Sequence, residues 1–305
     1  MKTNETAMVP KADVRTYYDR PVLKAPVWKW YIPAYFFTGG LAGVSSMLGF
    51  GAQVTGRRRL RRATRVTALA GITASAGLLV ADLGRPSRFH HMLRVAKVTS
   101  PMSVGSWLLA VYGPAAGLAA APELMGLFPR LGSAAGALAG VLGPAVATYT
   151  AVLVSDSAIP AWHEAHPYLP FVFGGGAAAS AGGAALVLTP VTESGPARRM
   201  AITGAVVELA ATQLMEHRLG EVGEPYADGP SGRLTKAAKV LIGAGALVTA
   251  IGGRRRTGAV VGGSMLVAGA LVERLAVFHA GVQSAADPAA VVGPQRRRVA
   301  ASARG

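Results

Sequence analysis

The chain has 305 residues, of which 51% are hydrophobic and only 15% charged, whereas soluble domains carry about 25% charged residues, so an ordinary soluble protein is excluded. The net charge of +16 does not indicate nucleic-acid binding, because the arginines cluster at the ends of apolar segments, where lipid headgroups and membrane topology account for them. The absence of cysteine excludes iron–sulfur clusters, c-type haem and disulfides within this chain.

Residues 1–30 form a polar N-terminal arm that lacks the features of a cleavable signal peptide. Crossing a bilayer takes about 20 apolar residues, and such a segment must be helical because lipid satisfies no backbone polar group. We therefore predict an all-α integral membrane domain over residues 31–280, followed by a basic tail over 281–305. Its eight transmembrane helices are expected at 31–55, 64–82, 103–121, 134–156, 166–190, 198–219, 235–252 and 257–280.

Eight spans place both termini on one side of the membrane, which we call the terminal face. Its loops are long and polar, and they cover residues 83–102, 157–165 and 220–234. The connections on the opposite face are mostly tight, basic turns. Functional residues lie disproportionately on loops, so the terminal face is the expected docking and reaction face. Short basic loops favour the cytoplasm, which places the opposite face inside and the terminal face outside.

Ionisable residues within apolar spans are costly, so each is a candidate functional residue. Asp82 and Asp156 end predicted spans, Glu208 lies near the middle of another, and Glu273 precedes Arg274 in the last. Asp82 could act chemically or cap the next turn, and Glu273 could simply pair with a cation. Glu208 requires a partner or water. Glu208, Glu273 and Asp156 are therefore candidates for a proton path.

Tyr35 and Tyr149 lie at similar predicted depths beneath the terminal face. A phenol there can hydrogen-bond a carbonyl such as that of a quinone, although tyrosines are also common anchors at the membrane interface. None of the six histidines is central in a span, so transmembrane haem is not expected. His163 and His166 have a spacing that a metal could use, but no third ligand motif is nearby, and we expect no metal site.

Several sequence motifs follow one another along the chain. The most specific are Asp82-Leu-Gly-Arg-Pro-Ser-Arg-Phe89 and Thr99-Ser-Pro-Met-Ser-Val-Gly-Ser-Trp107. The others are Trp28-x-Trp30, Gly39-Gly-Leu-Ala-Gly43, Tyr149, Ile159-Pro-Ala-Trp162 and Pro167-x-x-Pro170. Together these segments resemble one known family, the NrfD/PsrC family of polytopic membrane subunits of molybdopterin and related respiratory oxidoreductases. The C-terminal third is similar only in hydropathy.

The resemblance implies an eight-helix bundle of two four-helix halves without prosthetic groups. It also implies a quinone pocket beneath the face that docks a ferredoxin-like iron–sulfur subunit. Tyr149 matches the family's quinone-contacting tyrosine, and Asp82 matches an acidic residue suited to accept a proton. Tyr35 stands where some members have histidine, and Ile32 replaces a neighbouring asparagine. Trp30 completes the expected quinone-binding set.

The leading interpretation is a membrane anchor that exchanges electrons between a partner and quinone, with menaquinone expected from the arginine- and alanine-rich composition. The expected partners are a four-cluster ferredoxin-like iron–sulfur subunit and a molybdopterin catalytic subunit, at the cytoplasmic membrane. Asp82 and Tyr149 are the expected catalytic residues. One alternative is an ion-coupled secondary transporter that uses Glu208 and Glu273, for which an inverted repeat would be expected. Another is a purely structural anchor without quinone dependence.

Overall fold

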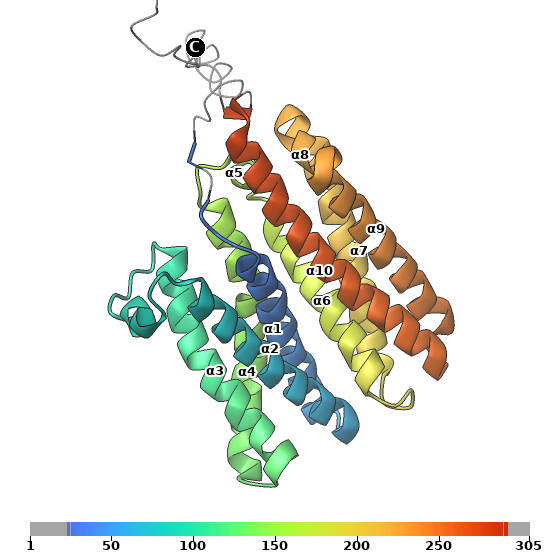
Figure 1. Ribbon diagram of the computed structural model, residues 1–305. Helices are drawn as coiled ribbons and strands as arrows, with labels where there is room; N and C mark the ends of the chain where they lie inside the picture. Colours follow the sequence, from blue (N-terminus) through green and yellow to red (C-terminus); the bar gives the residue numbers. More distant parts are fainter. Residues whose placement is uncertain (1–22, 25, 289, 292–305) are drawn as a thin grey trace, which may run out of the picture.

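The structure is a computed structural model that describes residues 23–24, 26–288 and 290–291. Over these residues the chain forms α-helices and short 3₁₀ helices and no strand (Figure 1). The long helices are α1 (Tyr31–Val54), α2 (Arg58–Asp82), α3 (Pro101–Met125), α4 (Pro129–Ser155), α6 (Leu169–Leu188), α7 (Gly195–Leu219), α9 (Gly229–Gly252) and α10 (Arg256–Ala286). Shorter elements fill the terminal-face loops: η2 (Pro86–Leu93), α5 (Pro160–His163), η3 (Gly220–Gly223) and α8 (Glu224–Ala227).

The all-α membrane prediction is confirmed, and the chain is a multi-pass integral membrane protein. Each predicted span coincides with a long helix, and several helices extend a few residues beyond the predicted ends. Six of the long helices in the described part of the chain have the length and hydropathy of a membrane span. The other two, α1 and α7, are not among these six: α7 carries charged residues, including Glu208, whereas α1 carries none. The predicted arm 1–30 and tail 281–305 lie mostly outside the described residues.

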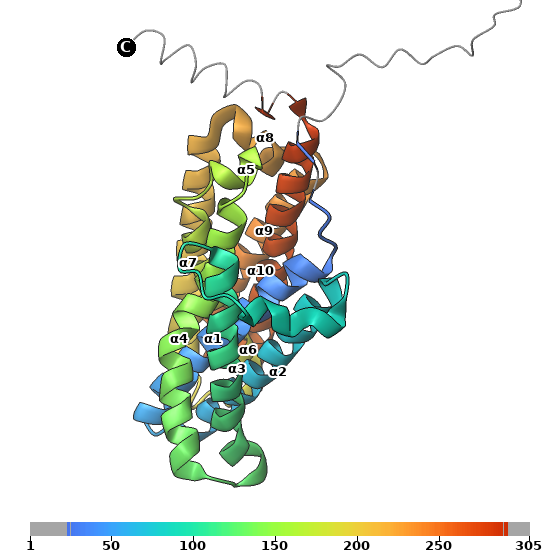
Figure 2. The same ribbon diagram turned by 90° about the vertical axis from the view of Figure 1, so that its left-hand side faces the viewer.

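The long helices form two groups that pack side by side (Figure 1). In the first group α1 packs against α2 and α4, and α3 packs against α4 and α2. In the second group α6 packs against α7 and α10, and α9 packs against α10 and α7. Helix α6 also contacts α1 and α4, so it joins the two groups. Figure 2 shows the segment around η2 projecting sideways from the first group, while α5 and α8 cap the second group at the terminal face.

Glycine brings the helix backbones together, as expected where no hydrophobic force drives helices together within lipid. Gly43 of α1 and Gly143 of α4 face each other so closely that a Cβ on either residue would overlap the other's carbonyl oxygen. Gly183 of α6 and Gly263 of α10 meet in the same way, since a Cβ on Gly183 would lie 2.6 Å from the Gly263 oxygen. The core is therefore tight because its helices touch through backbone atoms.

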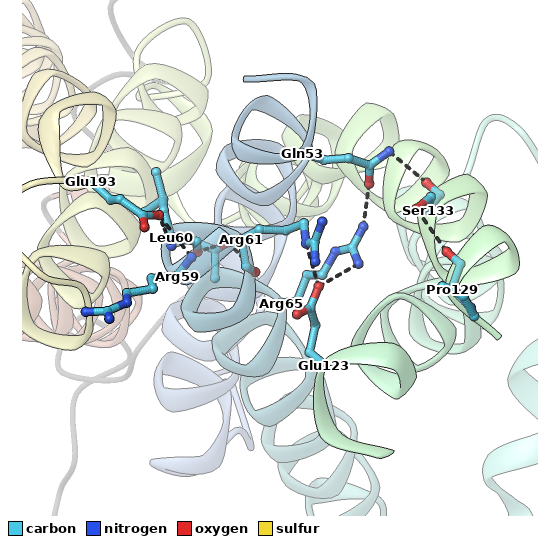
Figure 3. Close-up of polar contacts among 10 residues, drawn as sticks. Gln53, Arg59, Leu60, Arg61, Arg65, Glu123, Pro129, Ser133 and Glu193 are labelled. Atoms are coloured by element: carbon cyan, nitrogen blue, oxygen red, sulfur yellow. Dashed lines mark hydrogen bonds and ion pairs between the residues drawn. The ribbon is translucent and has the colours of Figure 1, made fainter. Parts of the chain in front are cut away.

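A polar network closes the opposite face, and Figure 3 shows its side chains converging between α1, α2, α3 and α4. Glu123 of α3 pairs with Arg61 at 2.6 Å and with Arg65 at 3.0 Å. Arg65, only 4% exposed, also donates to Gln53. Arg65 therefore fastens three helices from inside the bundle, whereas its sequence cluster had suggested a role in topology and headgroup contact alone.

Glu193, in the α6–α7 connection, links the two helix groups on the opposite face (Figure 3). Its Oε2 accepts from the backbone N–H groups of Arg59 at 2.9 Å and Leu60 at 3.3 Å. These donors have no partner within α2, because the first N–H groups of a helix are unpaired, and a carboxylate there also complements the helix dipole. The second group thereby caps a helix of the first.

The terminal face of the second group is closed by the segment around α5. Trp162 is fully buried, and its indole N–H donates to the Val277 carbonyl of α10 at 2.7 Å. The backbone N–H of Ala161 donates to Ser284 at 3.1 Å, and its carbonyl accepts from the Tyr226 hydroxyl at 3.1 Å. The 157–165 loop, expected as part of a docking surface, is therefore partly a plug that packs into the bundle.

Candidate functional site

A cavity of about 170 Å³ lies beneath the terminal face of the first helix group. Its walls come from α1, α2, α3 and α4, and Trp28 before α1, Leu83 after α2 and Met92 of η2 complete them. Most of the lining side chains are apolar. The polar exceptions are Tyr35, Asp82, Ser106 and Tyr149, so a few polar groups converge on an apolar chamber, as is typical of small-molecule sites.

Three residues singled out from the sequence therefore line one cavity. Tyr35 comes from the first turns of α1, Asp82 is the last residue of α2, and Tyr149 lies in the last two turns of α4. Tyr35 is buried, while Asp82 and Tyr149 are half-buried. Within the described residues the buried Tyr149 hydroxyl has no hydrogen-bond partner. An unpaired buried hydroxyl is costly unless a ligand or water satisfies it, so this group is available to a molecule in the cavity.

Gly105 explains how the Tyr149 ring reaches the cavity. A Cβ at this position would lie 2.7 Å from Cδ2 and 3.3 Å from Cζ of the tyrosine, so only glycine leaves room for the ring. Gly105 also lines the cavity, as does its neighbour Ser106. The Thr99–Trp107 segment thus contributes a cavity wall and makes room for a polar cavity residue.

The remaining polar residues of that segment fold the loop back onto α3. Ser100 caps the helix by accepting from the Ser103 backbone N–H at 3.4 Å. The Ser103 hydroxyl donates to the Val95 carbonyl at 2.8 Å and accepts from the Lys97 N–H at 2.9 Å. Trp107 donates to the same Val95 carbonyl at 3.3 Å. These bonds hold the loop that carries Met92 over the cavity.

Asp82 ends α2, and the next residue, Leu83, is extended and turns the chain outward toward η2. Among the described residues no hydrogen bond or ion pair holds the Asp82 carboxylate, so the cap for the Arg85 turn considered from the sequence is not formed. The segment beyond it is basic and mostly exposed, with Arg85, Arg88 and Arg94 among its residues. Asp82 therefore lies between the cavity and a basic surface.

Other expected site residues lie elsewhere. Trp30 is 63% exposed, contacts the Tyr31 ring and does not line the cavity. Trp28 lines it instead and stacks on Trp162 at a centroid distance of 5.8 Å. The Trp28-x-Trp30 motif pointed to this region, but helix α1 starts at Tyr31, so helical spacing could not tell which tryptophan turns inward. Asp156 is exposed at the end of α4, away from the other expected proton-path residues.

Glu208 and Glu273 meet in the second helix group, between α6, α7 and α10, together with Arg274. All three are buried, and none of them lines the cavity. Histidine and acidic residues form no group of three or more that could hold a metal ion within the part of the chain that the structure describes.

In a comparison with known protein families, the chain matches the family described as polysulphide reductase, NrfD, over residues 21–215. This stretch includes every residue that lines the cavity and ends within α7, so α9 and α10 lie beyond it. A comparison with curated proteins finds no match. Because the family match spans more than half of the chain, the protein belongs to the polysulphide reductase NrfD family.

Proposed function

We propose that this protein is the quinone-reactive membrane subunit of a respiratory oxidoreductase complex. The observation that supports this proposal is the cavity that brings Tyr35, Asp82 and Tyr149 together beneath the terminal face. An apolar cavity of about 150 Å³ accommodates a benzene ring. The 170 Å³ chamber is therefore of a size to hold one ring of a quinone headgroup, with the isoprenoid tail in lipid.

For quinone reduction, the protein has to supply hydrogen bonds to the quinone and a route for protons. Reduction of a quinone to a quinol takes two electrons and two protons, one for each carbonyl oxygen. In our proposal the electrons come from an iron–sulfur cluster of a partner, and the reverse reaction returns them. The Tyr149 hydroxyl donates a hydrogen bond to one carbonyl, and Asp82 exchanges the two protons, one after the other, between the quinone and water at the terminal face. Tyr35 contacts the ring of the quinone headgroup. The quinone in this proposal is menaquinone.

For the architecture, we propose that all eight long helices cross the membrane, as two halves of four. Helix α1 carries no charged residue, and Glu208, near the middle of α7, is buried among neighbouring helices. In this proposal the protein lies in the cytoplasmic membrane with the opposite face in the cytoplasm and the terminal face outside, because short basic turns favour the cytoplasm.

The partner in this proposal is a four-cluster ferredoxin-like iron–sulfur subunit, which in turn carries a molybdopterin catalytic subunit. It docks over the cavity on the segment 83–100, where basic residues outnumber acidic ones and are mostly exposed. An acidic partner surface would be complementary. Crosslinks that map mainly to Arg57–Arg62 or Arg254–Arg256 would contradict this docking site.

Quinone binding is tested by titrating the purified protein with a short-chain naphthoquinone and following tryptophan fluorescence, since Trp28 lines the cavity. We expect saturable quenching. Ser106→Leu places a larger apolar side chain into the cavity and should weaken binding at least tenfold. Ser264→Leu, which changes an exposed serine of α10, is the matched control and should bind normally. Equal, unsaturable quenching in all three proteins would show partition into detergent and contradict the proposal.

Asp82→Asn should slow quinone-linked turnover about tenfold or more, because asparagine keeps the shape of aspartate but cannot transfer a proton. Asp156→Asn is the control, since Asp156 also ends a helix but lies outside the cavity. Turnover is measured per assembled complex with a soluble menaquinol analogue. A full rate for Asp82→Asn would rule out the proton role, and lost assembly with a normal rate per complex would assign Asp82 to structure.

A further inference from the structure

The second helix group encloses a charged cluster that the quinone cavity does not use. Glu208 of α7 is 1% exposed, and Glu273 and Arg274 of α10 are 5% and 2% exposed. The cluster lies against α6 at Gly175 and Gly176, where the absence of side chains makes room for it. It lies close to the cavity, because the Phe173 ring beside it is 5.8 Å from the ring of Phe36, which lines the cavity.

Arg274 is held firmly in place. Its Nη1 pairs with Oε2 of Glu273, and its Nη2 donates to the Phe173 carbonyl at 2.6 Å. The guanidinium also stacks on the Phe173 ring, with Cζ 3.9 Å from the ring centroid. The guanidinium group of Arg274 therefore forms its ion pair with Glu273, and its other contacts described here are with Phe173 of α6.

Glu208 is left without a hydrogen bond, and both of its carboxylate oxygens are buried and unpartnered within the described residues. Oε1 of Glu273 is likewise unpartnered. Glu208 Oε1 and Arg274 Nη2 approach the same point, since they lie 2.9 Å and 3.2 Å from the position that a Cβ on Gly176 would take. The buried carboxyl group of Glu208 therefore points toward the guanidinium group of the Glu273–Arg274 ion pair.

Within the described part of the chain, no other charged side chain is found to compensate the second carboxylate. Helix α6 carries no titratable residue over its whole length, and His279 of α10 is exposed. On α9, Lys239 pairs with Glu216 of α7 at 2.5 Å. Above the cluster, the pKa of Tyr226 is raised, mainly by burial and further by the charge of Glu273, and its hydroxyl donates to Ala161.

We propose that Glu208 and Glu273 together bind one exchangeable proton, which Glu208 carries while Glu273 pairs with Arg274. With this proton the cluster has no net charge, whereas without it one carboxylate would be buried unpaired, which is costly in a membrane interior. A metal cation is a poor substitute, because the guanidinium beside it would repel it and the α6 carbonyls are engaged within the helix. The site stands apart from the proposed quinone chemistry, since none of these residues lines the cavity.

Infrared difference spectroscopy tests the proposal on the purified protein without any quinone. We expect the C=O band of a protonated carboxyl group at neutral pH that shifts in D₂O, is lost in Glu208→Gln and is kept in Glu216→Gln. Glu216 is the matched control because it lies on the same helix and forms a partly exposed ion pair with Lys239. Absence of the band from the wild-type protein, or its survival in Glu208→Gln, would overturn the proposal.

Thermal unfolding supplies a second readout. The native state should hold one more proton than the unfolded chain at neutral pH, so the stability of the wild-type protein should fall as pH rises. Glu208→Gln should fold and lose this pH dependence, because glutamine has the shape and neutrality of the protonated acid. A Glu208→Gln protein that fails to fold, or a wild-type protein stabilised by Na⁺ but not K⁺ at equal ionic strength, would contradict a proton site.

Discussion

Tyr149→Phe is expected to lower quinone-linked turnover about fivefold to hundredfold while the complex still assembles. The substitution removes only the Tyr149 hydroxyl group, which has no hydrogen-bond partner in the described structure. The packing of the aromatic ring against Gly105 is therefore unchanged. A buried hydrogen bond that is lost costs about 1 to 3 kcal/mol when its partner stays unpaired, and each 1.4 kcal/mol is a factor of ten. The measurement is the steady-state rate per assembled complex with a soluble menaquinol analogue.

Tyr112→Phe is the matched control. Tyr112 is also a buried tyrosine of the first helix group, but its hydroxyl already bonds Ser46 at 2.7 Å and it does not line the cavity. We expect this variant to lose about 1 kcal/mol of stability and to keep its rate per complex. If Tyr149→Phe retained both its rate and its KM, Tyr149 would be an interfacial anchor rather than a quinone contact.

The second large effect is structural: Gly143→Val should yield little folded protein. The new side chain would be driven into the Gly43 backbone of α1, which cannot rotate away as a side chain can. Overpacking a core costs about 1 to 3 kcal/mol even where side chains can adjust. Here α1 and α4 must separate, and the cavity that they both line would open with them.

Gly117→Ala provides the comparison for this prediction, because nothing lies within 4 Å of a Cβ at Gly117. Alanine is also the better helix former, so this variant should be as stable as the wild-type protein or slightly more so. Both variants are compared by the yield of monodisperse protein and by thermal unfolding in detergent. A Gly143→Val protein with wild-type unfolding behaviour would mean that the two helices do not touch as the structure has them.

The sequence predicted the helices well because long apolar segments have one solution in lipid. It placed the ends less well, since the criterion was hydropathy and several helices run on through polar residues. Helix α2 begins at Arg58 rather than 64, because Glu193 caps its first turn from the other helix group. A cap supplied from so distant a part of the chain leaves no local trace in the sequence.

The site was predictable where depth alone decided the question. Tyr35 and Tyr149 were chosen for their similar predicted depth and Asp82 because it ends a predicted span, and the structure places all three on one cavity. Both tryptophans of the Trp28-x-Trp30 motif precede α1, so helical spacing could not show which one turns inward, and Trp30 was selected where Trp28 lines the wall. Glu208 and Glu273 were grouped from the sequence as candidate proton-path residues, but only the packing of α7 and α10 against α6 reveals that Arg274 pairs with Glu273 and leaves Glu208 without a hydrogen bond.

The direct contacts between glycine backbones, such as that of Gly43 with Gly143, have a consequence for mutational scanning. Positions in this chain that tolerate no change will be of two kinds, and a growth or fitness screen will not separate them. Glycines at helix crossings will fail because the protein does not accumulate, although they carry no reactive group. Cavity residues will fail at normal abundance, so activity normalised to folded protein is the quantity that distinguishes chemistry from assembly.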